Sequence, residues 1–204
     1  MSAITAGTVV PGMNRGRPRD PEVERAILAA TQDLLVERGY AETTIAAVAA
    51  RAHCSKAAIY RRWDTKTALV VAAVRALHST APVPDTGSLR EDLRATARHY
   101  AASDPRGAGV LASLLSELGK DADLREAAYR AIGEPPVAAL VAVIRRWIER
   151  GEVSRDAPVD VIAGIIPTAA FGSVSLRRRT LDPEAIDALI DGVILPALRA
   201  SPPA

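Results

Sequence analysis

Apolar residues recur every three to four positions along most of the chain, which is the period of an α-helix with one buried face. The clearest case follows Asp20-Pro21, a capping residue and a proline at the first helical position. This helix is expected to run to Arg38, because Gly39 suits the position just after a helix end. Its predicted apolar face consists of Ile27, Leu28, Thr31, Leu34 and Leu35.

Capping residues, prolines and glycines divide the rest of the chain into further helices, about nine in all. Pro135-Pro136 either breaks or restarts the seventh helix, whose last part is expected to end at Gly151. No stretch shows the strict alternation of a strand, so the fold is predicted to be all-α. The later helices are expected to begin at Thr44, Ser55, Asp64 or Thr65, Ser88, Asp104, about Asp121, residue 158 and Asp182.

A break that contains proline and glycine, at residues 80–87, marks the expected domain boundary. It separates a small helical domain at residues 20–80 from a larger helical domain at residues 81–204. Residues 1–19 are expected to form a flexible basic arm.

The composition favours helices and a reducing compartment. The 204 residues include 40 alanines, and alanine is the best helix former. The single cysteine, Cys54, excludes an internal disulfide framework and a cysteine-rich zinc site. A chain of this length buries a sizeable core without such links, so we expect a cytoplasmic protein.

Charge is distributed unevenly, although the net charge is only +2. Residues 1–80 hold 11 basic against 7 acidic side chains, whereas residues 81–204 hold 15 against 17. The basic first part is the candidate for contact with a polyanion, although so small an excess also arises by chance.

Three kinds of function find no support in the sequence. The longest uncharged stretch, residues 161–176, is shorter than the ~20 residues that cross a bilayer, so no membrane partner is expected. No Ser/His/Asp set and no phosphate-binding glycine loop occurs, so no catalytic residue and no cofactor are expected. His53, His78 and His99 lack the short spacing of metal ligands, so no metal site is expected.

Residues 44–62 have the length of two short helices joined by a tight turn, the arrangement of a helix-turn-helix DNA reader. The second helix would lie in the major groove, with Ile59 facing inward as its anchor. The alternative is a solvated basic helix face. The side chains expected to face outward are those of Lys56, Ala57, Ala58, Tyr60, Arg61 and Arg62.

These side chains suit the two kinds of contact that such a reader makes with DNA. Lys56 can reach an acceptor on guanine, and the small Ala57 and Ala58 permit contact with a thymine methyl group. The donors expected to hold phosphates are Tyr60, Arg61, Arg62 and Lys66. Ser55, at the start of the second helix, is also expected to be among the DNA-binding residues.

Residues 39–69 closely resemble the N-terminal domain of the TetR family of bacterial transcriptional regulators, and the match extends over about residues 20–75. The resemblance implies a helical homodimer whose C-terminal domain binds a ligand and which usually represses a nearby promoter. It also implies that Thr44 meets a phosphate. The residues that carry the resemblance are Tyr40, Thr43, Thr44, Val48, Ala49, Ser55, Lys56, Tyr60, Trp63 and Lys66.

The turn departs from the family pattern. TetR-like sequences usually have Gly-Val-Ser here, whereas this chain has His53-Cys54-Ser55. The histidine must either adopt a positive φ at some energetic cost or take part in a different turn. Cys54 is expected to fill a buried position as a small hydrophobe, and a redox sensor beside cationic groups is the alternative.

The segment Arg15-Gly-Arg-Pro-Arg19 is a compact basic arm before the first helix, and it resembles the core of an AT-hook. Arg15 and Arg17 suit the negative potential of a narrow minor groove. The alternative is an untethered tail that adds only salt-dependent affinity.

The larger domain resembles, more loosely, the C-terminal domain of one TetR subgroup. In this family the final two helices, here 158–179 and 183–199, form a four-helix bundle with the partner subunit. Candidates for core and dimer seam are Val161, Ile162, Ile165, Ala169, Phe171, Ile186, Leu189, Ile190, Val193 and Leu198. An apolar effector pocket is expected between helices five to eight, although each lining residue is alternatively plain core. The predicted lining is Tyr100, Leu111, Leu114, Leu115, Trp147 and Phe171.

Three hypotheses for function follow. The first is a dimeric DNA-binding repressor that a small apolar or amphipathic effector releases from operator DNA. The second is a DNA-binding dimer without an effector. The third, an enzyme, has the least support.

Overall fold

The computed structural model describes residues 20–77, 82–101 and 105–199, and the regular structure in these ranges is helical throughout. Within them the chain forms nine continuous helical segments, in agreement with the number predicted. Two of these contain a π-helical turn, η1 (Tyr129–Gly133) or η2 (Ile190–Ile194). The α-helices are α1 (Pro21–Glu42), α2 (Ile45–Arg51), α3 (Lys56–Tyr60), α4 (Lys66–Arg75), α5 (Leu89–Ala101), α6 (Pro105–Leu115), α7 (Ala122–Ala128), α8 (Glu134–Glu149), α9 (Val159–Arg177), α10 (Pro183–Leu189) and α11 (Leu195–Arg199).

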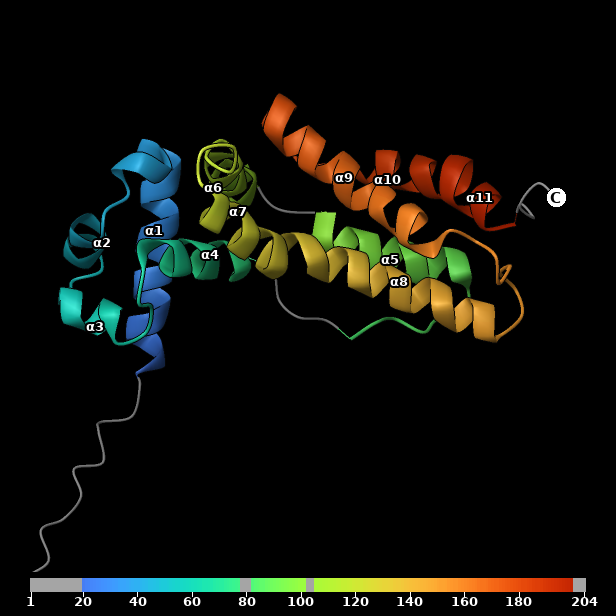
Figure 1. The fold of residues 1–204 in the computed structure, drawn as a ribbon, viewed down its shortest axis with the longest axis horizontal. Helices are drawn as coiled ribbons and strands as arrows, with labels where there is room; N and C mark the ends of the chain where they lie inside the picture. The colour runs from blue at the N-terminus through green and yellow to red at the C-terminus, as the bar shows by residue number, and fades with distance from the viewer. Residues whose placement is uncertain (1–19, 78–81, 102–104, 200–204) are drawn as a thin grey trace, which may run out of the picture.

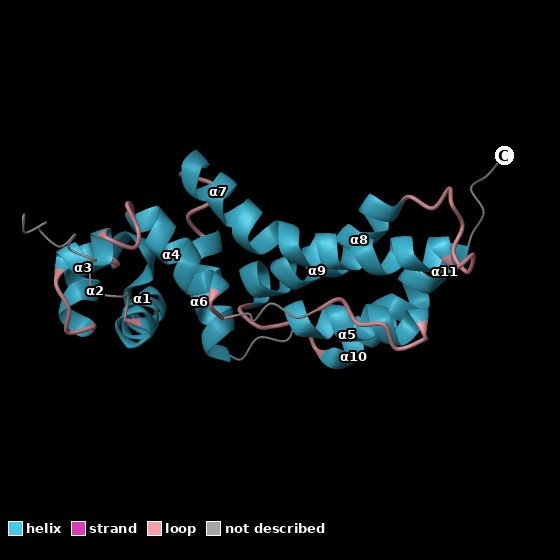
Figure 2. Ribbon diagram, turned by 90° about the horizontal axis from the view of Figure 1, so that it is seen from below, coloured by secondary structure: helices cyan, strands magenta, loops and turns pink. Residues whose placement is uncertain are grey.

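The molecule is elongated, with α1–α4 at one end and the long helices of the bundle, α5 and α8–α11, at the other (Figure 1). Helices α6 and α7 lie between these two parts. A view turned by 90° shows α1 almost end-on and the bundle helices running away from it (Figure 2). The predicted arm, with Arg15 and Arg17, lies outside the described residues.

Side-chain caps start the short N-terminal helices where the sequence predicts them. Thr44, Ser55 and Thr65 each accept a hydrogen bond from the backbone N–H three residues ahead, at 3.0–3.1 Å. Thr65, rather than Asp64, is therefore the cap of α4. Asp20 caps α1 in a similar way, accepting from the Glu22 N–H at 2.9 Å. These bonds satisfy N–H groups that have no partner inside the helix.

Several predicted helix ends differ from those in the structure. Gly39 leaves the helical conformation at φ +77°, as expected after a helix end, but a helical turn resumes and α1 extends to Glu42. Helix α3 ends at Tyr60 instead of Arg62, and α4 at Arg75 instead of about Ser79.

Prolines widen two helices instead of ending them. The pair Pro135-Pro136 lies in the first turn of α8, directly after η1. Pro196 is the second residue after η2, as Pro135 is the second residue after η1. A proline has no N–H to donate, and its ring crowds the carbonyl group four residues earlier. A π-turn just before the proline relieves this crowding, so the helix continues through it.

Three apolar cores run along the molecule. The N-terminal core joins α1–α4, and the bundle core joins α5 and α8–α11. The middle core joins α1 and α4 to α6 and α7, and thus connects the two ends of the molecule. The buried residues of the middle core are Leu35, Val70, Val71, Val74, Val110, Leu114, Leu124 and Ala128.

Two helical segments, Ala122–Glu149 and Val159–Arg177, are long and apolar enough to cross a membrane by length and composition. Both contribute residues to the bundle core, including Ile144 and Ile166, which are almost fully buried. Core helices of water-soluble proteins commonly pass the same test, so this finding is weak evidence for a membrane span.

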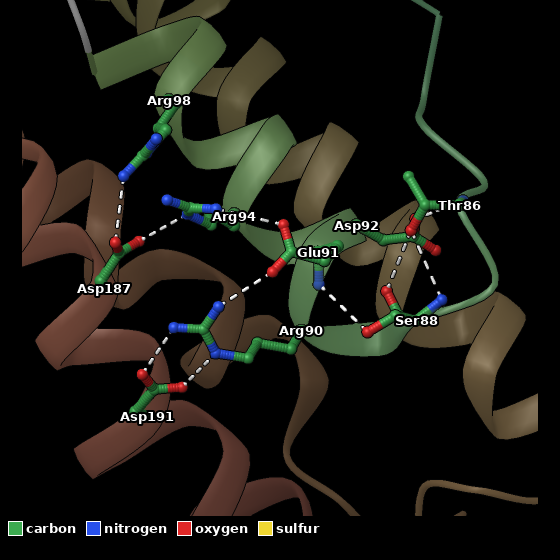
Figure 3. A network of polar contacts seen from close by, with 9 residues as sticks. All are labelled: Thr86, Ser88, Arg90, Glu91, Asp92, Arg94, Arg98, Asp187 and Asp191. Atoms are coloured by element: carbon green, nitrogen blue, oxygen red, sulfur yellow. Dashed lines mark hydrogen bonds and ion pairs between the residues drawn. The ribbon is translucent and has the colours of Figure 1, made fainter.

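Ion pairs fasten α5 to α10 and η2 (Figure 3). Arg90 donates to both carboxylate oxygens of Asp191 at 2.7 Å, which raises the pKa of the guanidinium. Arg94 and Arg98 both donate to Asp187 at 3.0 Å. The arginines are spaced by four residues, as are the two aspartates, so the pairs form a ladder between two helix faces.

Asp92 lies on the other side of α5 and is fully buried. Its carboxylate accepts hydrogen bonds from the backbone and hydroxyl of Thr86, each at 2.7 Å. It also accepts from the indole N–H of Trp147 at 2.9 Å and from Arg146 at 3.0 Å. One carboxylate therefore ties α5 to α8 and to the segment that enters α5.

Candidate DNA-binding surface and effector cavity

The turn between α2 and α3 has the tight geometry of a helix-turn-helix. His53 adopts a φ of +50°, so the histidine takes the strained alternative that the sequence left open. The Cys54 N–H donates to the carbonyl of Ala49 at 3.0 Å, which closes the turn. Arg51 binds both carboxylate oxygens of Glu37, at 2.6 and 2.7 Å, and so fixes α2 against α1.

One face of α3 is open to solvent and carries a mixture of cationic, aromatic and small side chains. Ile59 is fully buried as the predicted anchor. The expectation that Ala58 faces outward is wrong, because this residue is buried. Helix α3 has only one turn, so two consecutive residues suffice to cover its inner side. The predicted DNA-contacting residues that are exposed in the structure are Thr44, Ser55, Lys56, Ala57, Tyr60 and Arg61.

Arg62 was also expected to face outward, and this prediction is wrong. Its side chain is only 8% exposed and donates to the carbonyl oxygens of Ala58 and Asp20, at 3.1 and 3.2 Å. The reason is that the helix ends at Tyr60, so helical spacing no longer determines where Arg62 points. A sequence pattern gives no signal for such a contact, because Asp20 lies 42 residues away.

Lys66, at the first position of α4, is partly buried against α1. Its ammonium group lies 4.1 Å from the centre of the Tyr40 ring and donates to the carbonyl of Ala41 at 3.2 Å. Burial lowers the pKa of Lys66, and nearby Glu117 and Glu42 act in the opposite direction. Contact between Lys66 and a phosphate stays a prediction.

Cys54 packs against the N-terminal core and is partly exposed. Burial raises the pKa of its thiol, and the nearby Arg62 only partly offsets this effect. A raised pKa disfavours the reactive thiolate, so the side chain fits the role of a small hydrophobe. Within the described ranges, no cluster of three or more His, Cys, Asp or Glu side chains could hold a metal ion.

Two adjoining apolar cavities lie between the bundle and the middle core. The smaller, of about 50 Å³, is lined mainly by α5, α8 and α9. The larger, of about 300 Å³, lies against α6, α7 and η1. Both are lined by Leu111, Ile132, Pro167 and Phe171.

Five of the six predicted pocket residues line these cavities. Tyr100 lines the smaller one, and Leu114 and Leu115 line the larger one. Leu111 and Phe171 line both. Trp147 lines neither, and its assignment to the pocket is wrong. It is buried in the bundle core because its indole N–H binds the carboxylate of Asp92.

The outer face of α9 and of the α10–α11 segment carries apolar and small residues that have no cover within the chain. Val161 is 71% and Leu176 85% exposed, and Val193 is also exposed. A side chain added at three glycines of these helices would meet open space, so a second helix could approach closely. Those glycines are Gly164, Gly172 and Gly192. Of the predicted core or seam residues, Ile162, Ile186, Ile190 and Leu198 belong to the core within the chain.

A helix-turn-helix whose second helix exposes Lys56 and Tyr60, attached to a helical bundle that contains an apolar cavity, is typical of a DNA-binding transcriptional regulator. The chain belongs to the TetR family. The model of the TetR family of bacterial regulatory proteins matches residues 27–73, and that of the tetracyclin repressor-like C-terminal domain matches residues 83–193.

Individual proteins agree with this assignment. An uncharacterised HTH-type transcriptional regulator of Mycobacterium bovis is 32% identical over 190 residues, with coverage of 91% of this chain and 94% of that protein. The DNA-binding transcriptional repressor TetR of Mycobacteroides abscessus is 34% identical, with coverage of 85% and 93%. The crystal structure of the TetR family transcription regulator SCO0332 superposes with a TM-score of 0.62 at 26% identity, with coverage of 85% and 97%.

Proposed function

We propose that this TetR-family regulator is a homodimeric repressor, acting on DNA in the cytoplasm, that an amphipathic effector releases from its operator. The observation that carries the proposal is the position of the larger cavity. Its wall includes Leu114 and Ala128, which are also members of the middle core that contacts α1 and α4. A ligand in the cavity therefore presses on side chains that support the helix-turn-helix.

The physical link is direct packing. Protein interiors are close-packed, so a displaced wall residue moves its neighbours instead of being absorbed. Leu114 shares the middle core with Val70 of α4 and Leu35 of α1. A shift of this layer changes the angle of α1 and α4, and with it the spacing of the two recognition helices in a dimer. The effector can lower the affinity for DNA only to the extent that it binds the shifted conformation more tightly than the DNA-binding one.

The dimer is proposed to form through the outer faces of α9 and the α10–α11 segment. Exposed apolar residues on both helices favour a partner of the same kind, and a four-helix bundle buries them. Gly172→Arg should convert the dimer into a monomer, measured by sedimentation equilibrium. Arg155→Glu, on an exposed loop, is the control that should leave the dimer intact.

The lining of the cavities favours an effector with an apolar body and one anionic end. Arg125 is the one charged residue in the lining of the two cavities, and Tyr129 lies beside it. A carboxylate at Arg125 would gain a charge-assisted hydrogen bond, while its alkyl or aryl body would fill the apolar space.

The test compares decanoate with 1-decanol, two ligands of equal chain length that differ in charge. Decanoate should raise the thermal midpoint of the wild-type protein and weaken its binding to a DNA duplex selected by this protein from random sequence. Leu111 lines both cavities, so Leu111→Trp should obstruct the passage between them and weaken both effects, whereas the exposed Ser116→Trp should preserve them. If no apolar ligand from a wider metabolite screen binds, the chain is a DNA-binding dimer without an effector.

A further inference from the structure

A third cavity adjoins the smaller of the two cavities described above. Its volume is about 350 Å³, and its walls come from α5, α8 and residues 82–84, in the segment that leads into α5. Thr96 and Tyr100, about one turn apart on α5, line both this third cavity and the smaller one. The smaller cavity also shares Leu111 and Phe171 with the larger one. The three cavities therefore form a row, and the smaller cavity lies in the middle.

The segment that covers the third cavity is a fixed wall. Arg146 donates a hydrogen bond to the carbonyl oxygen of Pro84, and Arg150 binds the carboxylate of Asp85 at 2.8 Å. Both arginines belong to the C-terminal end of α8, the helix that contributes another wall of the same cavity. The third cavity is therefore bounded by elements that are tied to each other.

The smaller cavity restricts what can extend from one side of the row to the other. Its volume of about 50 Å³ corresponds to only about four water-sized spheres. The Tyr100 ring, which borders it, contacts the His99 ring edge-on, with the ring centres 4.8 Å apart. An unbranched alkyl chain is about as wide as a water molecule, whereas methyl branches and fused rings are wider. We therefore expect only an unbranched chain to extend through the smaller cavity.

Charge decides which end of such a ligand lies in which cavity. Arg125, which lines the larger cavity, is exposed, as is its neighbour Tyr129. Among the described residues, no Lys, Arg, Asp or Glu lines the smaller or the third cavity. A carboxylate buried there would lack a charged partner, which is costly, whereas an alkyl chain gains from apolar burial. The charged end of a ligand is therefore expected at Arg125, and its chain is expected to point toward the third cavity.

We propose that the three cavities act as one binding channel for an unbranched long-chain carboxylate. The carboxylate binds at Arg125, the chain passes through the smaller cavity, and its end lies in the third cavity. This inference rests on the proposed function, the binding of an amphipathic effector, and adds the chemical class of that effector. A shorter chain such as decanoate also binds, but it leaves the third cavity unfilled.

The test compares ligands of different length and shape in the full chain by isothermal titration calorimetry, below their critical micelle concentrations. Palmitate should bind at least about tenfold more tightly than decanoate, because its additional methylene groups exchange water for the third cavity. Phytanate has the same backbone length as palmitate but carries methyl branches. It should bind at least about tenfold less tightly than palmitate, because the branches do not pass the smaller cavity.

A pair of neighbouring substitutions on α8 tests where the end of the chain lies. Ala139 lines the third cavity alone, whereas Ala138 is exposed and lines none of the three. Ala139→Trp should reduce the preference for palmitate over decanoate to less than about threefold, and Ala138→Trp, the matched control, should preserve it. Should Ala139→Trp not fold, as shown by its thermal melt, Ala95→Trp takes its place, because Ala95 is exposed and also lines the third cavity alone.

Three results would overturn the channel and leave the proposed effector function standing. They are equal affinities of the wild-type protein for palmitate and decanoate, equal affinities for palmitate and phytanate, and a preference for palmitate that survives the substitution in the third cavity. If neither decanoate nor palmitate binds the wild-type protein, the proposed release by an amphipathic effector fails, and the channel fails with it.

Discussion

The two ends of the molecule reach a defined geometry by different means. In the N-terminal part, α2 and α3 have seven and five residues, and hydroxyl caps, the Arg51–Glu37 pair and Arg62 hold them in place. In the bundle, helices of up to 19 residues pack over a broad apolar core. Helices as short as α3 have little stability of their own, so directional bonds must supply what contact area supplies in the bundle.

This difference suits the functions proposed for the two parts, DNA binding and effector binding. A DNA-contacting surface needs side chains at fixed positions, and directional bonds to the backbone provide them. A cavity that accepts a ligand needs walls that can shift without breaking specific bonds. Apolar packing is non-directional, and the described cavities indeed lie among apolar side chains.

The largest effect is expected where the bundle departs from this rule, at Asp92. Asp92→Ala would leave Trp147, Arg146 and Thr86 without their shared acceptor in a buried site. Removing one partner of a buried ion pair costs about 3–5 kcal/mol of unfolding free energy. Urea denaturation measures the loss. If Asp92→Ala loses less unfolding free energy than the cap variant Ser55→Ala, apolar contact area alone holds the bundle together.

Acid should weaken the same site. Burial raises the pKa of Asp92, but the hydrogen bonds from Thr86, Trp147 and Arg146 outweigh this and bring it below the ordinary 3.8. A carboxyl with a lowered folded-state pKa stabilises the protein above its ordinary pKa, and this contribution is lost as the pH falls through the folded value. The stability difference between wild type and Asp92→Asn should therefore be constant near neutral pH and shrink as the pH falls below 3.8.

In the N-terminal part the largest effect should be on binding instead of stability. Lys56→Gln removes a cationic donor from the exposed face of α3 and should cost about 1–3 kcal/mol of DNA-binding free energy. The thermal midpoint should stay unchanged, because the side chain is exposed. Lys120→Gln, an exposed lysine outside the N-terminal part, removes the same charge and should leave affinity nearly intact when measured by fluorescence anisotropy.

Loss of a helix cap should cost more unfolding free energy in the N-terminal part than in the bundle. Ser55→Ala removes the cap of the five-residue α3 and should cost about 1 kcal/mol of unfolding free energy. Ser88→Ala, before the 13-residue α5, removes a longer contact of 3.5 Å and should cost about half as much or less. Chemical denaturation of both variants makes the comparison, and equal costs would contradict a special dependence of the N-terminal part on caps.

A small effect that depends on salt is expected in the ion ladder. Asp187→Asn weakens the pairs with Arg94 and Arg98, which are partly exposed, and should cost about 0.5–1 kcal/mol. The cost should decline in 1 M salt, because screening weakens exposed pairs. A cost that is independent of salt would show that the ladder acts through packing.

Much of this arrangement could be predicted from the sequence, and the limits have physical causes. The caps at Thr44 and Ser55 depend on neighbouring residues, so a local pattern reveals them. Trp147 and Arg62 were misplaced because their partners, Asp92 and Asp20, are 55 and 42 residues away. An aromatic or cationic residue can suit several environments, and only the fold selects among them.

The π-turn η1 determines the direction in which the residues before and after it face. A π-turn contains one residue more than the α-helical path it replaces, so it offsets α7 from α8 by about 100° of rotation. Leu124, before the turn, faces α4 in the middle core, whereas Leu140, after it, faces the bundle core. Deleting a single residue within η1 would restore a regular α-helix. Either Leu124 or Leu140 would then be rotated away from its core. The extra residue therefore lets one continuous helix serve two cores that point in different directions.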